Sequence, residues 1–289
     1  MEHPVVVGVD GSDGSLVALD WAAEEATRFG LPLRVVYASL WERYEGGVPS
    51  ATGERPEEEV AAQHIVTSAG QRARQLAPGL EVNAVTVPDD AADALVKESD
   101  SADVVVTGCS GRGAVRELLL GSVTLAVAGR ARCPVVVVRG EERNVKGHSR
   151  RVVVGVGEGE EATGAVRFAF REAAARGCEL QVVRAWRDSR RPTDPLSVLD
   201  SAARAYAEEA AAALDEVLEE ALTAHPGVAI TRTVVEGSAR RALLGPAADA
   251  DLLVLGATRR REGFGLHLGR VSHTALHRAG CPVAVVPHR

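Results

Sequence analysis

The sequence contains the same pattern twice, and this repeat constrains the fold more than any other feature. Three segments of the first half recur in order in the second half: VVVGVD at 5–10 as VVVGVG at 152–157, DVVVTG at 103–108 as DLLVLG at 251–256, and CPVVVV at 133–138 as CPVAVV at 281–286. The offset is 147 residues for the first pair and 148 for the others. Such a steady offset indicates a duplication, and the unit is too long for a solenoid repeat. Each copy is therefore expected to have its own core.

The duplication predicts two domains, over residues 1–143 and 150–289, joined by a polar stretch of linker character near 140–149. Within each copy, short β-branched runs alternate with longer Ala-rich segments. In the first copy we expect strands near 4–9, 33–38, 80–87, 103–107 and 135–139, and helices near 14–29, 57–77, 90–100 and 122–131. In the second copy we expect helices near 160–176, 197–224, 238–248 and 270–279.

The Val-rich runs lack the polar alternation of a half-exposed strand, as expected where helices cover both faces of a sheet. Alternation of strands and helices with right-handed crossovers gives a doubly wound sheet. The predicted fold class is therefore α/β, with two tandem five-stranded parallel sheets of Rossmann-like type. In such a sheet, ligands bind beyond the carboxyl ends of the strands at the switch point. The loops after the first and fourth strands are thus the candidate site.

Charge and composition exclude several classes of protein. The formal net charge is −7, which disfavours a general affinity for nucleic acid or for an anionic membrane. No stretch approaches the roughly twenty apolar residues of a membrane span, and the N-terminus runs directly into a strand-like run, so we expect no signal peptide. The four cysteines are far apart and form no CxxC pair. We interpret them as reduced thiols of a cytoplasmic protein.

A glycine-rich loop follows the fourth strand of the first copy. It reads Gly108-Cys109-Ser110-Gly111-Arg112-Gly113, and Gly121-Ser122-Val123-Thr124 follows at the start of the next helix. Glycine lets the backbone approach an anion closely, and the free amides of a helix N-terminus favour phosphate. The hydroxyls of Ser122 and Thr124 can donate as well. It is not a Walker A loop, since no Gly-Lys-Ser/Thr follows.

The spacing of this loop, Gly-x2-Gly-x9-Gly-Ser, resembles the ATP-binding signature of universal stress proteins. The Val-rich first strand that ends in Asp10-Gly11-Ser12 and the Cys-Pro-Val-Val-Val-Val last strand agree with that family, and the resemblance covers nearly the whole chain in two copies. It implies an adenine nucleotide alpha hydrolase-like fold. It also implies residue roles in the first copy. Asp10 with Gly11 would contact the nucleoside, and the backbone at Ala38 would border the adenine. The residues expected around the ribose and phosphates are Gly108, Ser110, Gly111, Gly121, Ser122, Val123 and Thr124.

We add Arg112, whose charge lies beside the expected triphosphate path, although it is as well explained as a solvated loop residue. The resemblance also implies Mg²⁺, held mostly by phosphate oxygens. Cyclic or diphosphate adenine nucleotides would fit the same loop. We expect a nucleotide-sensing regulator of the stress response without an obvious general base, hence no enzyme or at most a slow ATPase. A nucleotide-free interaction scaffold is the other alternative.

The second copy departs from the signature. Arg259 replaces the second glycine, Arg270 replaces the serine, and Gly157 replaces the aspartate of the first strand. The arginines attract phosphate in principle, but Glu158, Glu160 and Glu161 on the facing loop could neutralise them. We therefore expect a degenerate site that is plugged from within.

The resemblance also implies how the copies assemble. Universal stress domains generally pair through their final strands, here 135–139 and 283–287, because a strand at a sheet edge has unpaired backbone groups. We expect the two copies to form an intramolecular pseudo-dimer. This pseudo-dimer is compatible with further association of two chains into a homodimer and with binding of an unknown protein partner.

Overall fold

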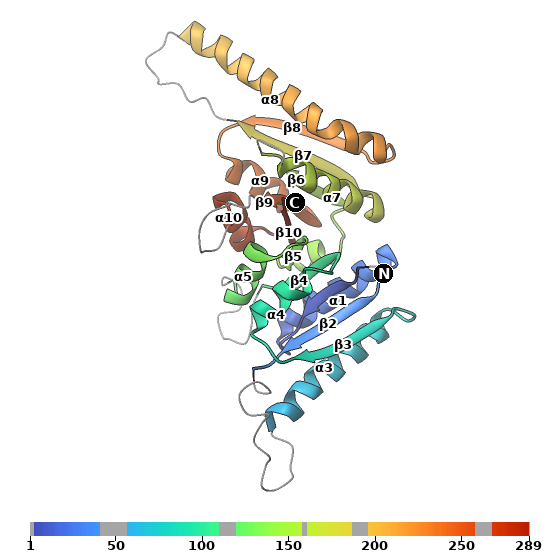
Figure 1. The fold of residues 1–289 in the computed structure, drawn as a ribbon. Coiled ribbons are helices and arrows are strands. Elements are labelled where there is room, and N and C mark those ends of the chain that lie inside the picture. Colours follow the sequence, from blue (N-terminus) through green and yellow to red (C-terminus); the bar gives the residue numbers. More distant parts are fainter. Residues whose placement is uncertain are drawn as a thin grey trace. The chain divides into compact units, whose positions relative to one another are not determined.

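A computed structural model describes residues 3–40, 57–109, 120–157, 161–186, 196–257 and 268–288. The chain divides into two compact units, and the boundary between them lies between Arg139 and Gly140. We call these the first and the second unit and describe each by itself (Figure 1).

The first unit is a five-stranded parallel sheet with helices between its strands. Its elements are β1 (Val5–Gly8), α1 (Asp13–Phe29), β2 (Leu33–Ala38), α3 (Glu57–Leu76), β3 (Val82–Val87), α4 (Ala91–Glu98), β4 (Val104–Gly108), α5 (Ser122–Arg130) and β5 (Val135–Val138). The strand order is β3-β2-β1-β4-β5. The order reverses direction at β1, so the carboxyl ends of β1 and β4 form the switch point at which ligands bind in such sheets.

The second unit repeats this topology. Its elements are α6 (Glu142–Val145), β6 (Arg151–Gly155), α7 (Glu161–Arg176), β7 (Glu179–Trp186), α8 (Leu196–Ala224), β8 (Ile230–Glu236), α9 (Ala239–Ala247), β9 (Leu252–Ala257), α10 (Arg270–Arg278) and β10 (Val283–Pro287). The strand order is β8-β7-β6-β9-β10, again all parallel. The prediction of two tandem, doubly wound, five-stranded parallel sheets is confirmed.

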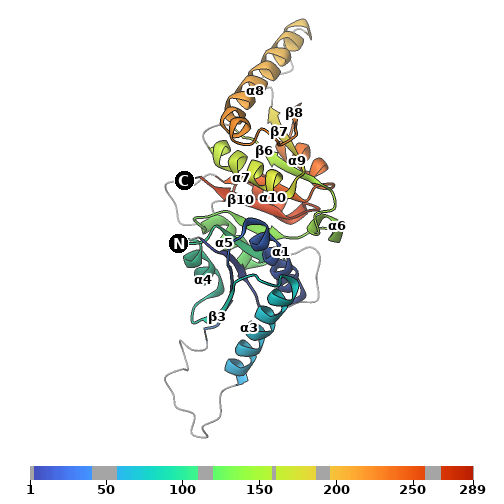
Figure 2. The same ribbon diagram turned by 90° about the vertical axis from the view of Figure 1, so that its right-hand side faces the viewer.

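Helices cover both faces of each sheet, which is why the strands consist of uninterrupted apolar runs. In the first unit α1 and α3 pack on one face while α4 and α5 pack on the other, as Figure 2 shows. In the second unit α7 and α8 share one face, and α9 and α10 share the other. The three consecutive valines of β1, Val5 to Val7, are completely buried, and so are Val152 to Val154 of β6. Valine suits this position because its branched side chain packs well on a pleated surface.

The stretch that the sequence suggests as a linker is ordered within the second unit. It contains the short helix α6, and Asn144 on that helix is completely buried. The side-chain amide of Asn144 donates to the carbonyls of Ala248 at 2.9 Å and Gly280 at 2.7 Å. Its side-chain oxygen accepts from the hydroxyl of Ser149 at 2.7 Å. Polar composition predicts a linker, whereas the buried side chain of Asn144 binds two backbone carbonyls of the second unit.

Candidate functional site

A cavity of about 260 Å³ lies at the switch point of the first unit. Its wall is formed by the ends of β1, β2 and β4, by the first turns of α1 and α5, and by one face of α4. The lining residues are Gly8, Val9, Asp10, Ser15, Val36, Tyr37, Ala38, Ala91, Leu95, Thr107, Gly108, Gly121, Ser122, Val123 and Thr124. Most of the wall is apolar, and a few polar groups converge on it, as in most small-molecule sites.

The structure brings together most of the residues that the sequence singled out. The predicted residues that line this cavity are Asp10, Ala38, Gly108, Gly121, Ser122, Val123 and Thr124. Gly11 does not line it, but its φ of +79° shapes the turn between β1 and α1, a conformation that glycine adopts without strain. Ser110, Gly111 and Arg112 lie outside the described residues.

The turn after β1 holds the Asp10 carboxylate in one orientation. Its Oδ1 accepts hydrogen bonds from the amide of Ser12 at 2.9 Å and from the hydroxyl of Ser12 at 2.5 Å. The Ser12 hydroxyl also accepts from the amide of Ser15 at 3.3 Å and so caps the N-terminus of α1. The Ser15 hydroxyl donates to the Ser12 carbonyl at 2.9 Å. The start of α1 and the position of the carboxylate therefore depend on the same two serines.

The turn after β4 is held by its own hydrogen bonds. Thr124 donates its hydroxyl proton to the carbonyl of Gly108 at 2.9 Å, so this side chain closes the base of the loop. That differs from the phosphate-donor role expected from the sequence. Gly108 packs so closely on α1 that a Cβ there would lie 2.5 Å from the Gly14 carbonyl oxygen, which no side chain permits. Gly121 is the N-cap of α5, and the first amides of that helix form one wall of the cavity.

Helix α4 supplies an apolar wall that sequence reasoning missed. Ala91 and Leu95 line the cavity, and Leu95 lies directly over Gly8, where a Cβ would be 2.7 Å from its Cδ1. The helix is fixed to β2 by a bidentate ion pair from Arg34 to Glu98, with N–O distances of 2.7 and 2.9 Å. The hydrogen bonds to Glu98 raise the pKa of the Arg34 guanidinium above its ordinary value. A signal was present in the sequence, because Ala91 and Leu95 recur in the second copy as Ala239 and Leu243.

Thr107 is the second residue that sequence reasoning missed. It is the penultimate residue of β4, is 4% exposed and lines the cavity. Its hydroxyl is shielded from solvent and has no hydrogen-bond partner among the described residues.

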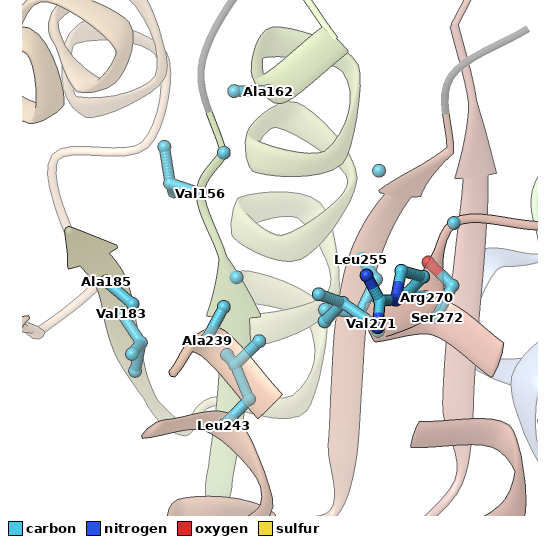
Figure 3. Close-up of a pocket in the computed structure, with 14 residues that line it drawn as sticks. Val156, Ala162, Val183, Ala185, Ala239, Leu243, Leu255, Arg270, Val271 and Ser272 are labelled. Carbon is cyan, nitrogen blue, oxygen red and sulfur yellow. The ribbon is translucent and has the colours of Figure 1, made fainter. Parts of the chain in front are cut away.

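The second unit has a cavity of about 250 Å³ at the equivalent place. It is lined by Gly155, Val156, Gly157, Ala162, Val183, Ala185, Ala239, Leu243, Leu255, Gly256, Gly269, Arg270, Val271 and Ser272, all drawn in Figure 3. Each of these positions has a counterpart in the lining of the first cavity, where Tyr37 is the one additional residue, but the polar groups differ. The positions of Asp10, Ser15, Thr107 and Ser122 in the first unit are occupied in the second by Gly157, Ala162, Leu255 and Arg270, respectively.

Of the residues expected to plug the second site, Glu158, Glu160 and Arg259 lie outside the described part of the chain, whereas Arg270 lines the cavity. The described residues leave a cavity of nearly the same volume as in the first unit. Within the described residues, the two cavities therefore differ more in the chemistry of their walls than in their volume.

Comparison with known proteins identifies relatives over the full length. The model of the universal stress protein family matches residues 1–139 and again 148–287. A universal stress protein of Mycobacterium tuberculosis strain H37Rv is 34% identical over 293 residues, which cover 98% of this chain and 97% of the relative. A second universal stress protein from the same strain is 31% identical over 294 residues, which cover 97% of this chain and 95% of the relative.

The fold is also found among solved structures. The crystal structure of a universal stress protein from Archaeoglobus fulgidus superposes with a TM-score of 0.70 at 18% identity, and the match covers 98% of both chains. Within the described residues, no helix is long and apolar enough to cross a membrane.

Proposed function

The chain belongs to the universal stress protein family, with two tandem copies of the domain, and on this premise we propose that the first unit binds one ATP. The protein would act as a nucleotide-sensing regulator in the stress response. One observation carries the proposal: at the switch point of the first sheet, a single cavity has a fixed carboxylate and the uncapped N-terminus of a helix in its wall. A nucleoside with phosphates needs both of these groups.

The parts of the wall suit different parts of ATP. The apolar surface made by Val36, Ala38 and Leu95 suits the faces of an adenine ring. The oriented carboxylate of Asp10 suits the hydroxyls of a ribose, since a carboxylate accepts hydrogen bonds from two neighbouring O–H groups. The first amides of α5, with the hydroxyl of Ser122, suit a phosphate.

We propose that Mg²⁺ accompanies the nucleotide and is held mainly by phosphate oxygens. Of the described residues that line the cavity, Asp10 alone carries a carboxylate. The described part of the chain also contains no cluster of three metal-ligating side chains. Mg²⁺ typically keeps several waters and binds through substrate phosphates with one or two carboxylates. A wall with a single carboxylate is compatible with this mode of coordination.

A binding role fits this wall better than an enzymatic one. Apart from Asp10, which Ser12 already engages, none of the described lining residues is a histidine, glutamate or lysine that would serve as a general base. We therefore propose that ATP is bound without appreciable turnover, and that partners recognise the nucleotide-bound conformation or assembly.

Nucleotide release separates the candidate functions. Purified full-length protein is denatured, the released nucleotide is quantified, and phosphate production by the native protein is measured at steady state. Co-purified ATP with negligible turnover is the expected result. Appreciable turnover would favour a slow ATPase, and the absence of nucleotide at any added concentration would favour an interaction scaffold.

A further inference from the structure

The floor of the first cavity contains a polar atom that none of the described residues binds. The Oγ1 of Thr107 is buried and has no hydrogen-bond partner in the described part of the chain, although the side chain lines the cavity. Other hydroxyls in the same wall are engaged: Ser15 donates to Ser12, and Thr124 donates to Gly108. A buried hydroxyl without a partner destabilises the folded state and is uncommon in native proteins.

The fold does not require a hydroxyl at this position. The other strand residues on the same run, Val104 to Val106, are valines, and valine has nearly the shape of threonine. In the second unit the equivalent residue is Leu255, on a strand with the same pairing partners. Its Cδ2 would be 2.8 Å from a Cβ on Gly155, beside Leu243, and Figure 3 shows both leucines in that cavity wall. An apolar residue therefore completes the same sheet in the same environment.

We infer that Thr107 is a specificity-determining residue of the first unit, whose hydroxyl exchanges a hydrogen bond with a polar atom at the buried end of the ligand. This inference rests on the proposed function and extends it. A threonine hydroxyl both donates and accepts, so it matches a ring nitrogen or an exocyclic amine of a heterocycle. A ligand with a purely hydrocarbon end would leave it unpaired, and a site with a buried polar group discriminates strongly against such a ligand.

The same reasoning separates the two cavities. Leu255 and Leu243 give the second cavity an apolar floor, which offers nothing to the polar edge of a base. Because the described residues leave cavities of almost the same volume, this difference in the floor would favour binding of an adenine nucleotide by the first unit.

The test compares Thr107→Val with Thr107→Ser in the full-length chain. Valine removes only the hydroxyl, and serine keeps it. We expect Thr107→Val to raise the Kd for ATP about tenfold by calorimetry, because the ligand atom is then buried without a partner. Thr107→Ser should stay within about twofold of the wild type on the same grounds. Thr86→Val on β3, outside the cavity lining, is the matched control and should leave the Kd unchanged.

The melting temperature of the ligand-free protein completes the test. Thr107→Val should melt at the wild-type temperature or above it, since the substitution removes an unpaired buried hydroxyl. If the wild type binds ATP and Thr107→Val binds it equally well, the inference is wrong and the proposed function stands. A different result would assign Thr107 to packing and overturn the inference: Thr107→Val binds ATP more weakly and melts at a lower temperature than the wild type, and Thr107→Ser loses as much affinity. A wild type that binds no adenine nucleotide overturns both.

Discussion

Ser12 donates two hydrogen bonds to the same carboxylate oxygen of Asp10, from its amide at 2.9 Å and from its hydroxyl at 2.5 Å. The pair spans the turn from β1 to α1, and the same hydroxyl caps the helix by accepting from Ser15. The carboxylate is therefore oriented before any ligand arrives. A preoriented group loses little further freedom on binding, so more of its interaction energy contributes to affinity.

Replacing Asp10 by asparagine should weaken ATP binding by about 10- to 100-fold, the range expected when a hydrogen bond to a charged group is lost. The amide keeps the size of the side chain but removes the charge and one acceptor. Calorimetric titration of the full-length protein measures the effect. Asp13→Asn is the control, because Asp13 lies in the first turn of α1, is exposed and does not line the cavity. Equal affinities for Asp10→Asn and the wild type would remove Asp10 from the site.

Gly121→Arg should abolish ATP binding and leave the melting curve unchanged. Among the described residues, a Cβ on Gly121 would meet only Thr124 Oγ1, at 3.9 Å, and the backbone φ of −65° suits any residue, so the fold tolerates the side chain. The arginine would instead occupy the place expected for phosphate. The matched control is Gly269→Arg, at the N-cap of α10, where a Cβ meets no described atom within 4 Å. Near-normal affinity in Gly121→Arg would place the site elsewhere.

Calorimetry should give one ATP per chain. The second cavity has lost the carboxylate of Asp10, which Gly157 replaces, and the hydroxyl of Thr107, which Leu255 replaces. A stoichiometry near two would contradict this, and Gly269→Arg would then be expected to reduce it to one.

Asn144→Ala should lower the free energy of unfolding of the second unit by about 1–3 kcal/mol, because the carbonyls of Ala248 and Gly280 lose the donor that the buried Asn144 side chain supplies. Urea denaturation followed by circular dichroism measures this. The neighbouring Arg143 makes an exposed ion pair with Asp249, so Arg143→Ala should cost less than about 1 kcal/mol. Similar losses in the two variants would show that burial of Asn144 adds little.

The pairing of the two copies through their final strands stays a prediction. If it is right, residues 1–139 expressed alone should form a homodimer that binds ATP, since the edge of β5 would then be covered by its symmetry mate. Light scattering at micromolar concentration decides the point. A monodisperse monomer would show that β5 is not the pairing edge.

Much of the fold could be predicted because the strands are continuous Val-rich runs. The segment expected as a helix at 57–77 is α3, Glu57–Leu76, and the strand expected at 33–38 is β2. Such runs are typical of a sheet covered on both faces, and the crossover rule then leaves few topologies. The glycine loop was also recognisable, because loops at a switch point are few, and the resemblance to universal stress proteins added Asp10.

The rest of the site could not be predicted because it depends on register. Thr107 is one residue in a buried strand, and only the pairing of β4 with its neighbours shows that it ends at the cavity. Leu95 has the ordinary pattern of a core residue on an amphipathic helix. Likewise the polar stretch after Arg139 gave no sign of burial, since the partners of Asn144 lie 104 and 136 residues away along the chain.

The burial of Asn144 implies an order of events during synthesis. Domains tend to fold as units, the N-terminal one first, while the chain is still emerging from the ribosome. The first unit has all its strands once Val138 is made. The segment from Gly140 to Ser149 is translated next, but Gly280, which it contacts, lies 136 residues beyond Asn144 and is made much later. The joint between the two copies is thus among the earliest parts of the second unit to be synthesised and among the last to become ordered.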